Sequence, residues 1–164
     1  MTTLHSQEQQ QRQRPTSVGE LRELMGVPLG PTDWFEVTQQ RVDAFAEITE
    51  DRQWIHVDPQ RAAVSDLGTT IAHGLLTLSL GPKFLEDLIA FDGFAHSLNY
   101  GYEKVRFPAP LPVGSRLRMH ATVTAVDDVL GGANMTAALR FEREGSEKPV
   151  CVAAAVARFV EHSA

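Results

Sequence analysis

The segment 72–89 constrains the fold more than any other part of the chain, because a helix formed by it has almost no polar face. Leucine, phenylalanine and isoleucine side chains are spread around nearly its whole circumference. Such a helix is stable only when it is buried on all sides. Pro82 lies inside the segment and is expected to kink or interrupt the helix. The sequence therefore predicts an apolar helix enclosed by the rest of the protein.

The part of the chain that follows this helix has the pattern of a sheet. Apolar residues recur there with a period of two, which indicates strands with one buried face, and proline- and glycine-containing turns separate the segments. Long antiparallel strands beside one apolar helix predict an α+β fold, in which a curved antiparallel sheet wraps around a central helix. The strands are predicted at residues 98–107, 117–125, 135–141 and 150–160.

The amino-terminal third reads as a tail followed by short helices. Residues 1–16 are polar and rich in glutamine and arginine, so we expect a disordered tail and a single domain over 17–164. Helix-capping signals begin at Ser17, at Thr38 and at Asp58, which precedes a proline. These signals predict three short helices ahead of the apolar segment.

Composition excludes several classes of function. The formal net charge of −6 disfavours a nucleic-acid partner, since phosphate binding needs a basic face. No apolar run is long enough to cross a membrane. Cys151 is the only cysteine, so neither an internal disulfide nor a cysteine-based zinc site can form, and the histidines lack metal-ligand spacing. We predict a cytoplasmic protein that binds no metal and no cofactor.

Three residues carry the candidate chemistry. Asp51 and His56 stand five residues apart, after one predicted helix and before the next, and Gly74 lies at the start of the apolar helix. A carboxylate, an imidazole and a backbone N–H at a helix start are the groups needed to add water across an activated double bond. The pattern favours a hydratase or dehydratase acting on an acyl thioester.

These residues resemble the MaoC-like dehydratases, the family of (R)-specific enoyl-CoA hydratases. The family's signature, Asp-x-Asn-Pro-x-His, stands here as Asp51-Arg-Gln-Trp-Ile-His56. Gln53 and Trp54 replace the usual Asn and Pro, as in a subgroup related to nodulation protein N. Further similarity lies in Ile71-Ala-His-Gly-Leu75 and in residues 102–115.

The resemblance implies a hotdog fold, pairing into a homodimer, and a hydro-lyase reaction on an acyl-CoA or acyl carrier protein thioester that gives the (R)-3-hydroxyacyl product. It also implies that Asp51 and His56 are the catalytic pair, that Gly74 donates its N–H to the thioester oxygen, and that the Gln53 amide contributes to substrate binding. Which member of the pair is the base, how long the acyl chain is and which carrier holds it stay open.

Other functions and other roles for single residues stay in view. The chain is alternatively a non-catalytic acyl-CoA-binding hotdog protein or the structural subunit of a dehydratase complex. A hotdog thioesterase is disfavoured, because the only carboxylates of the central helix, Glu86 and Asp87, lie near its far end. His73 either supports the catalytic pair or is a capping or core histidine, and Gly74 either donates to substrate or simply allows a tight entry into the helix.

Overall fold

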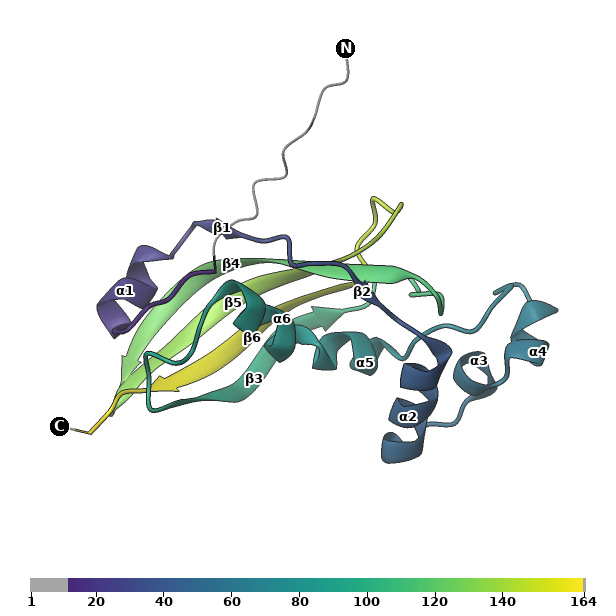
Figure 1. Ribbon diagram of the computed structural model, residues 1–164, viewed down its shortest axis with the longest axis horizontal. Helices are drawn as coiled ribbons and strands as arrows, with labels where there is room; N and C mark the ends of the chain where they lie inside the picture. Colours follow the sequence, from purple (N-terminus) through teal and green to yellow (C-terminus); the bar gives the residue numbers. More distant parts are fainter. Residues whose placement is uncertain (1–11, 164) are drawn as a thin grey trace, which may run out of the picture.

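Six antiparallel strands form one curved sheet, and the helices lie along one of its faces and beyond one of its ends (Figure 1). The structure is a computed structural model that describes residues 12–163. The predicted α+β sheet-and-helix architecture is confirmed, with strands close to the predicted segments. The strands are β1 (Pro28–Leu29), β2 (Phe35–Glu36), β3 (His96–Arg106), β4 (Arg116–Val129), β5 (Gly132–Arg143) and β6 (Cys151–Val160).

The strand order across the sheet is β1-β4-β5-β6-β3, and β2 also pairs with β4. Two hairpins join β4 to β5 and β5 to β6, and each turn contains a glycine with positive φ, Gly131 at 79° and Gly145 at 73°. Glycine adopts this conformation without the steric cost that other residues meet. The register is continuous along β5 and β6, from Gly132 opposite Val160 to Phe141 opposite Cys151. β3 comes before these hairpins in the chain but returns to the edge beside β6.

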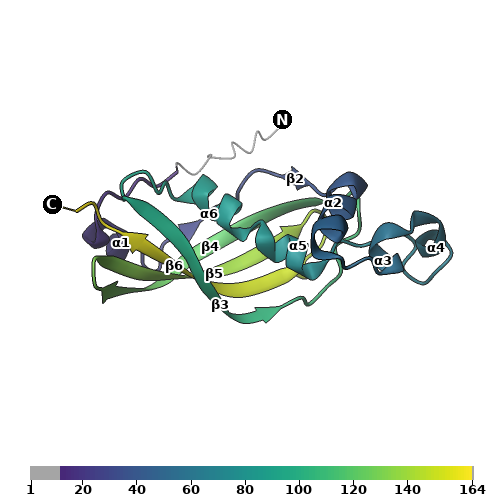
Figure 2. The ribbon, with the colours of Figure 1, turned by 90° about the horizontal axis from the view of Figure 1, so that it is seen from below.

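The apolar segment forms two helices, α5 (Gly74–Ser79) and α6 (Gly81–Leu88), with the interruption that Pro82 predicts. The expectation that this segment is buried on all sides is wrong, since the Leu75 side chain is 62% exposed. The sheet covers one side of α5 and α6, and α2 (Gln39–Thr49) lies beside α5 (Figure 2), but the Leu75 side of α5 stays open to solvent. No helix within residues 12–163 is both long and apolar enough to span a membrane.

The core lies between α6 and the sheet. Phe84 is fully buried, and its ring lies 5.8 Å from that of Phe35 and 6.2 Å from that of Phe141. Met119 and Met135, also fully buried, extend the core along β4 and β5. Side chains buried to this degree contribute most of the favourable free energy of folding. The sheet and α6 therefore form the stable frame on which the rest of the chain is mounted.

Three short helices project beyond one end of the sheet (Figure 2). Two of them begin at the predicted caps, because the Thr38 hydroxyl accepts from the Arg41 amide and the Asp58 carboxylate accepts from the Arg61 amide. This region, which we call the helical extension, runs from residue 39 to residue 73. Its helices are α2 (Gln39–Thr49), α3 (Trp54–Val57) and α4 (Pro59–Ala63).

The amino-terminal region differs from the predicted disordered tail over residues 12–16. Gln13 forms a parallel bridge with Ile89, with backbone hydrogen bonds of 2.8 Å to Leu88 and 2.7 Å from Ala90. Residues 1–11, the remainder of the predicted tail, lie outside the described residues. The third predicted cap lies just beyond, where Ser17 caps α1 (Val18–Glu23).

Candidate active site

Asp51 lies in the loop that leaves α2. The helix ends at Glu50, which adopts the left-handed conformation with φ of 61° and turns the chain away from the helix axis. This turn places Asp51 beside the start of α5, and its side chain remains 46% exposed. A carboxylate at this position meets both solvent water and the histidines described next.

His56 is buried in α3, with 6% of its surface exposed. Its Nδ1 lies 2.7 Å from the backbone carbonyl oxygen of Ile71. A carbonyl only accepts hydrogen bonds, so Nδ1 carries a proton and, in the neutral ring, Nε2 presents a lone pair. Burial lowers the pKa of His56 below its ordinary value of 6.5, against the opposing effects of the Ile71 hydrogen bond and of Asp51. Near neutral pH the His56 ring is therefore mainly uncharged, and its Nε2 lone pair is available to accept a proton.

His73 joins the two residues. Its ring stacks on the His56 ring at 3.7 Å between centroids, with 24° between the planes. Its Nε2–H donates to the backbone carbonyl oxygen of Asp51 at 2.9 Å, and the same nitrogen lies 4.0 Å from a carboxylate oxygen of that residue. His73 is also the residue that precedes α5, which it enters without a side-chain cap. It contacts both members of the predicted pair and adjoins Gly74.

Gly74 is the first residue of α5, where the backbone N–H has no acceptor within the helix. A Cβ atom at this position would stand 2.9 Å from the ring of Phe107, so a side chain would displace that ring. Gly74, Phe107 and His56 line a cavity of about 300 Å³, together with Thr77, Pro110 and Leu111. Gly74 and His56 thus line the same cavity.

The sequence-predicted pair is brought together. One side-chain ligand atom each of Asp51, His56 and His73 lies within 4.8 Å of the others. A separation of this size can be spanned by one water molecule that hydrogen bonds to both the carboxylate and the imidazole. A shared metal ion suits the cluster poorly, because the lone pairs of two stacked imidazoles do not point at a common ion about 2.0–2.1 Å from each ring. The absence of a metal remains a prediction, now with this geometric argument for it.

Gln53 is not brought into the cavity. It precedes α3 as its N-cap residue, with an exposed side chain that makes no capping hydrogen bond. Its backbone carbonyl accepts from the His56 amide at 3.0 Å, so the residue shapes the turn of α3 through its main chain. Substrate binding by the Gln53 amide remains a prediction. Among the residues that sequence reasoning missed, Phe107 gave no signal, because its contact with Gly74 joins residues far apart in the chain.

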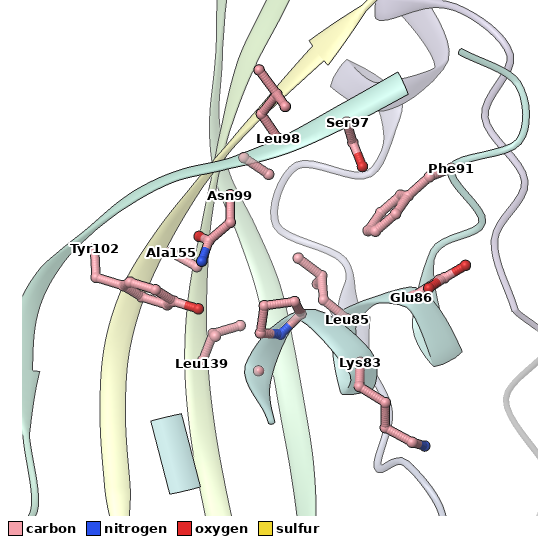
Figure 3. Close-up of a pocket in the computed structure, with 13 residues that line it drawn as sticks. Lys83, Leu85, Glu86, Phe91, Ser97, Leu98, Asn99, Tyr102, Leu139 and Ala155 are labelled. Carbon is pink, nitrogen blue, oxygen red and sulfur yellow. The ribbon is translucent and has the colours of Figure 1, made fainter. Parts of the chain in front are cut away.

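A second cavity of about 390 Å³ lies beside α6, the helix that continues from α5 (Figure 3). Leu85 of α6, Phe91 in the following loop and Leu139 of β5 give it an apolar lining, and Tyr102 of β3 presents its hydroxyl group there. Glu86 and Asp87, the carboxylates of this helix, pair with Arg12 and Lys83, and neither lines the cavity that His56 lines. The thioesterase alternative therefore gains no carboxylate from the central helix at that cavity.

Comparisons with known proteins agree with this geometry. A family model described as the MaoC-like domain matches residues 21–144. The 3-hydroxyacyl-thioester dehydratase Z of Mycobacterium tuberculosis is 46% identical over 145 residues, covering 88% of this chain and 96% of that protein. Nodulation protein N of Rhizobium meliloti is 38% identical over 157 residues, covering 87% and 92%. An unliganded R-hydratase, PhaJ1 from Pseudomonas aeruginosa, has a TM-score of 0.68 at 20% identity, covering 87% of this chain and 86% of its own, and confirms the hotdog fold alone.

Proposed function

Because the chain belongs to the MaoC-like dehydratase family, we propose that it is an (R)-specific enoyl-CoA hydratase, which adds water to a trans-2-enoyl thioester and catalyses the reverse dehydration. The single observation that carries the proposal is the cluster at the start of α5. Side-chain ligand atoms of Asp51 and His56 come within 4.8 Å of each other, and His56 lines the same cavity as Gly74.

In the proposed reaction, one water molecule is held between the Asp51 carboxylate and Nε2 of His56. The tautomer of His56 favours it as the base, since its Nδ1–H is engaged by Ile71. As the water oxygen bonds to Cβ, one water proton passes to Nε2, and the resulting imidazolium is stabilised by the adjacent carboxylate. The pair then returns one proton to Cα on the same face, which regenerates both groups and gives the (R)-3-hydroxyacyl thioester.

The Gly74 N–H acts where charge develops. Attack at Cβ moves negative charge onto the thioester carbonyl oxygen, and a backbone donor already in place stabilises that oxygen without reorganising. The positive end of α5 adds to this effect, although the helix is short. The contact with Phe107 explains why glycine suits the position, because any side chain would displace a ring that lines the same cavity.

The acyl chain and the assembly follow from the same proposal. The 390 Å³ cavity along α6 offers an apolar site for an acyl chain that continues past α5. The edge strand β3 carries exposed Leu98 and Tyr100, and pairing of this edge with a second copy would cover both. The proposal is therefore a cytoplasmic homodimer that binds a coenzyme A or acyl carrier protein thioester.

Hydration of short- and medium-chain trans-2-enoyl-CoA, followed by loss of the conjugated-thioester absorbance, tests the proposal. We expect turnover by the wild-type protein with an (R)-alcohol product, and a decrease of about 10²- to 10⁴-fold in kcat for Asp51→Asn. Asp66→Asn, an exposed carboxylate of the same region, is the control and should match the wild type. A folded wild-type protein that binds acyl-CoA but turns over no chain length would contradict the proposal and favour the non-catalytic binding protein.

A further inference from the structure

His73 makes more contacts with the catalytic groups than either of them makes with the other. Its side chain is 3% exposed, and it meets Asp51 through a hydrogen bond and His56 through a stacked ring. The ring of Phe45, from α2, lies 5.0 Å from its centroid on a tilted plane. His73 is thus confined between two rings, and its one observed hydrogen bond points at the main chain of Asp51.

The hydrogen-bonding pattern specifies the form of the ring. Nε2 must carry a proton, because its partner is a carbonyl oxygen. Nδ1 is buried and has no hydrogen-bond partner among residues 12–163. A proton on Nδ1 would be a buried donor without an acceptor, which costs free energy. A ring with its single proton on Nε2 therefore suits this position, and that proton fixes the loop that carries Asp51.

His73 contacts groups that come from three separate parts of the chain. Asp51 follows α2, His56 belongs to α3 and Gly74 begins α5, so the three groups come from separate elements of the chain. His73 is covalently joined to Gly74. Among the described residues, His73 both hydrogen bonds to Asp51 and stacks on His56. Errors of about 1 Å in the placement of reacting groups are enough to lower rates roughly a hundredfold.

We propose that His73 is a positioning residue, which holds the main chain of Asp51 with its Nε2–H and supports the ring of His56 with its face, and so fixes both groups beside the Gly74 amide. This inference rests on the proposed hydratase function. His73 touches neither water nor substrate in this role and acts only through its two neighbours.

Two substitutions of His73 test its hydrogen bond to Asp51 and its stacking on His56 separately. His73→Gln keeps an N–H where Nε2 stands and removes the ring, whereas His73→Phe keeps a ring and removes the donor. His162→Gln, an exposed histidine beyond β6, is the matched control. For each full-length variant, thermal unfolding, kcat and KM for enoyl-CoA hydration and the pH profile of kcat/KM are measured. The tautomer and titration of His56 are followed by ¹⁵N NMR without substrate.

We expect KM to stay close to wild type while kcat falls roughly a hundredfold in His73→Phe, because the Asp51 loop is released. His73→Gln should recover much of this loss. In both variants the acid limb of kcat/KM should move to higher pH. The groups facing His56 are His73 and Asp51, and removing the first removes an imidazole that disfavours protonation of His56.

Unchanged kcat and an unchanged acid limb in both variants would overturn the proposal. So would a variant with lower thermal stability but wild-type kcat and pH profile per folded molecule, since that is the behaviour of a purely structural residue. If His73→Phe does not fold, the test rests on His73→Gln, through the acid limb of its kcat/KM profile and the ¹⁵N titration of His56. If the wild-type protein has no hydratase activity, the proposed function fails on its own. The NMR titration then still tests the positioning role, which an unchanged His56 tautomer and titration in His73→Gln would exclude.

Discussion

The sheet and the helical extension are held together by different forces. In β4, β5 and β6, alternating side chains such as Met119, Met135 and Phe159 are fully buried, and the strands pair in long registers. The helical extension, residues 39–73, buries few large side chains and depends on polar side chains that bind backbone groups. Apolar burial is strong but non-directional, whereas hydrogen bonds are individually weak and set positions within tenths of an ångström. The sheet therefore supplies stability, and the extension supplies the geometry of the site.

The contacts of Gln39 show how hydrogen bonds set the geometry of the helical extension. Its Nε2 donates to the His56 carbonyl oxygen at 2.8 Å, and its Oε1 accepts from the Thr70 hydroxyl at 2.5 Å. Thr70 precedes Ile71, whose own carbonyl accepts from the His56 ring. One amide at the start of α2 thus ties α3 to the segment around Ile71 that orients the His56 imidazole. Bonds of this kind add about 0.5–1.5 kcal/mol each, so their value lies in orientation more than in stability.

This difference between the two regions predicts that a core substitution in the sheet lowers the free energy of unfolding but leaves kcat unchanged. Phe159→Ala removes a fully buried ring that packs against Phe91 and Phe94, far along the chain from the site. We expect the free energy of unfolding to fall by about 3–5 kcal/mol, measured by urea denaturation, while kcat per folded molecule is unchanged. Leu130→Ala, in an exposed turn, is the control and should leave both quantities unaltered. A lower kcat in folded Phe159→Ala protein would contradict the division between frame and site.

Damage at the junction of the two regions should have the opposite effect. Gly74→Ala brings a methyl group against the ring of Phe107, in the wall of the cavity that both residues line. Alanine keeps the backbone N–H, but the methyl group and the displaced ring crowd the space where the substrate would meet it. We expect kcat to fall by up to about a hundredfold, the size of the effect of one oxyanion donor, with a small change in the free energy of unfolding. Gly101→Ala is the matched control, because a Cβ there meets nothing within 4 Å.

A second substitution sharpens this test. Adding Phe107→Leu to Gly74→Ala provides room for the methyl group and leaves the backbone N–H in place. If the double variant regains wild-type kcat, displacement of the Phe107 ring caused the loss, and the glycine is required for packing. If kcat stays low, the methyl group itself keeps the substrate from the amide, as the oxyanion role of the N–H predicts.

Sequence patterns predict the frame better than the site. Period-two alternation is a local signal, and it located β4 and β5 because each strand carries it within its own residues. The caps at Thr38 and Asp58 are equally local, and they located two helices of the extension. The motif placed Asp51 and His56 together by resemblance, and the structure brings them within reach of one water molecule.

What the sequence could not predict depends on contacts between distant segments. The bridge from Gln13 to Ile89 joins two residues with no periodic pattern, and composition alone suggested disorder. Leu75 is apolar yet exposed, because the sheet covers only one side of α5 and a hydrophobic pattern does not reveal how much of a helix its neighbours enclose. The sequence alone allowed two interpretations of His73, because its stacking on His56 and its hydrogen bond to the Asp51 carbonyl are visible only in the three-dimensional structure.

The smallest predicted effect concerns how the site contributes to stability. Burial lowers the pKa of His56 in the folded protein below the 6.5 that it has in the unfolded chain. Between those two values the unfolded chain binds more protons, so the free energy of unfolding must decrease as pH falls through this window. His56→Asn keeps a donor for the Ile71 carbonyl but does not titrate, so it should lose this decrease and otherwise unfold like the wild type above pH 7. Urea denaturation of both proteins from pH 4 to pH 8 measures the difference. If the free energies of unfolding of the two proteins change in parallel with pH, the pKa of His56 is the same in the folded and the unfolded chain. That result would remove the reason to treat His56 as a neutral base held by the helical extension.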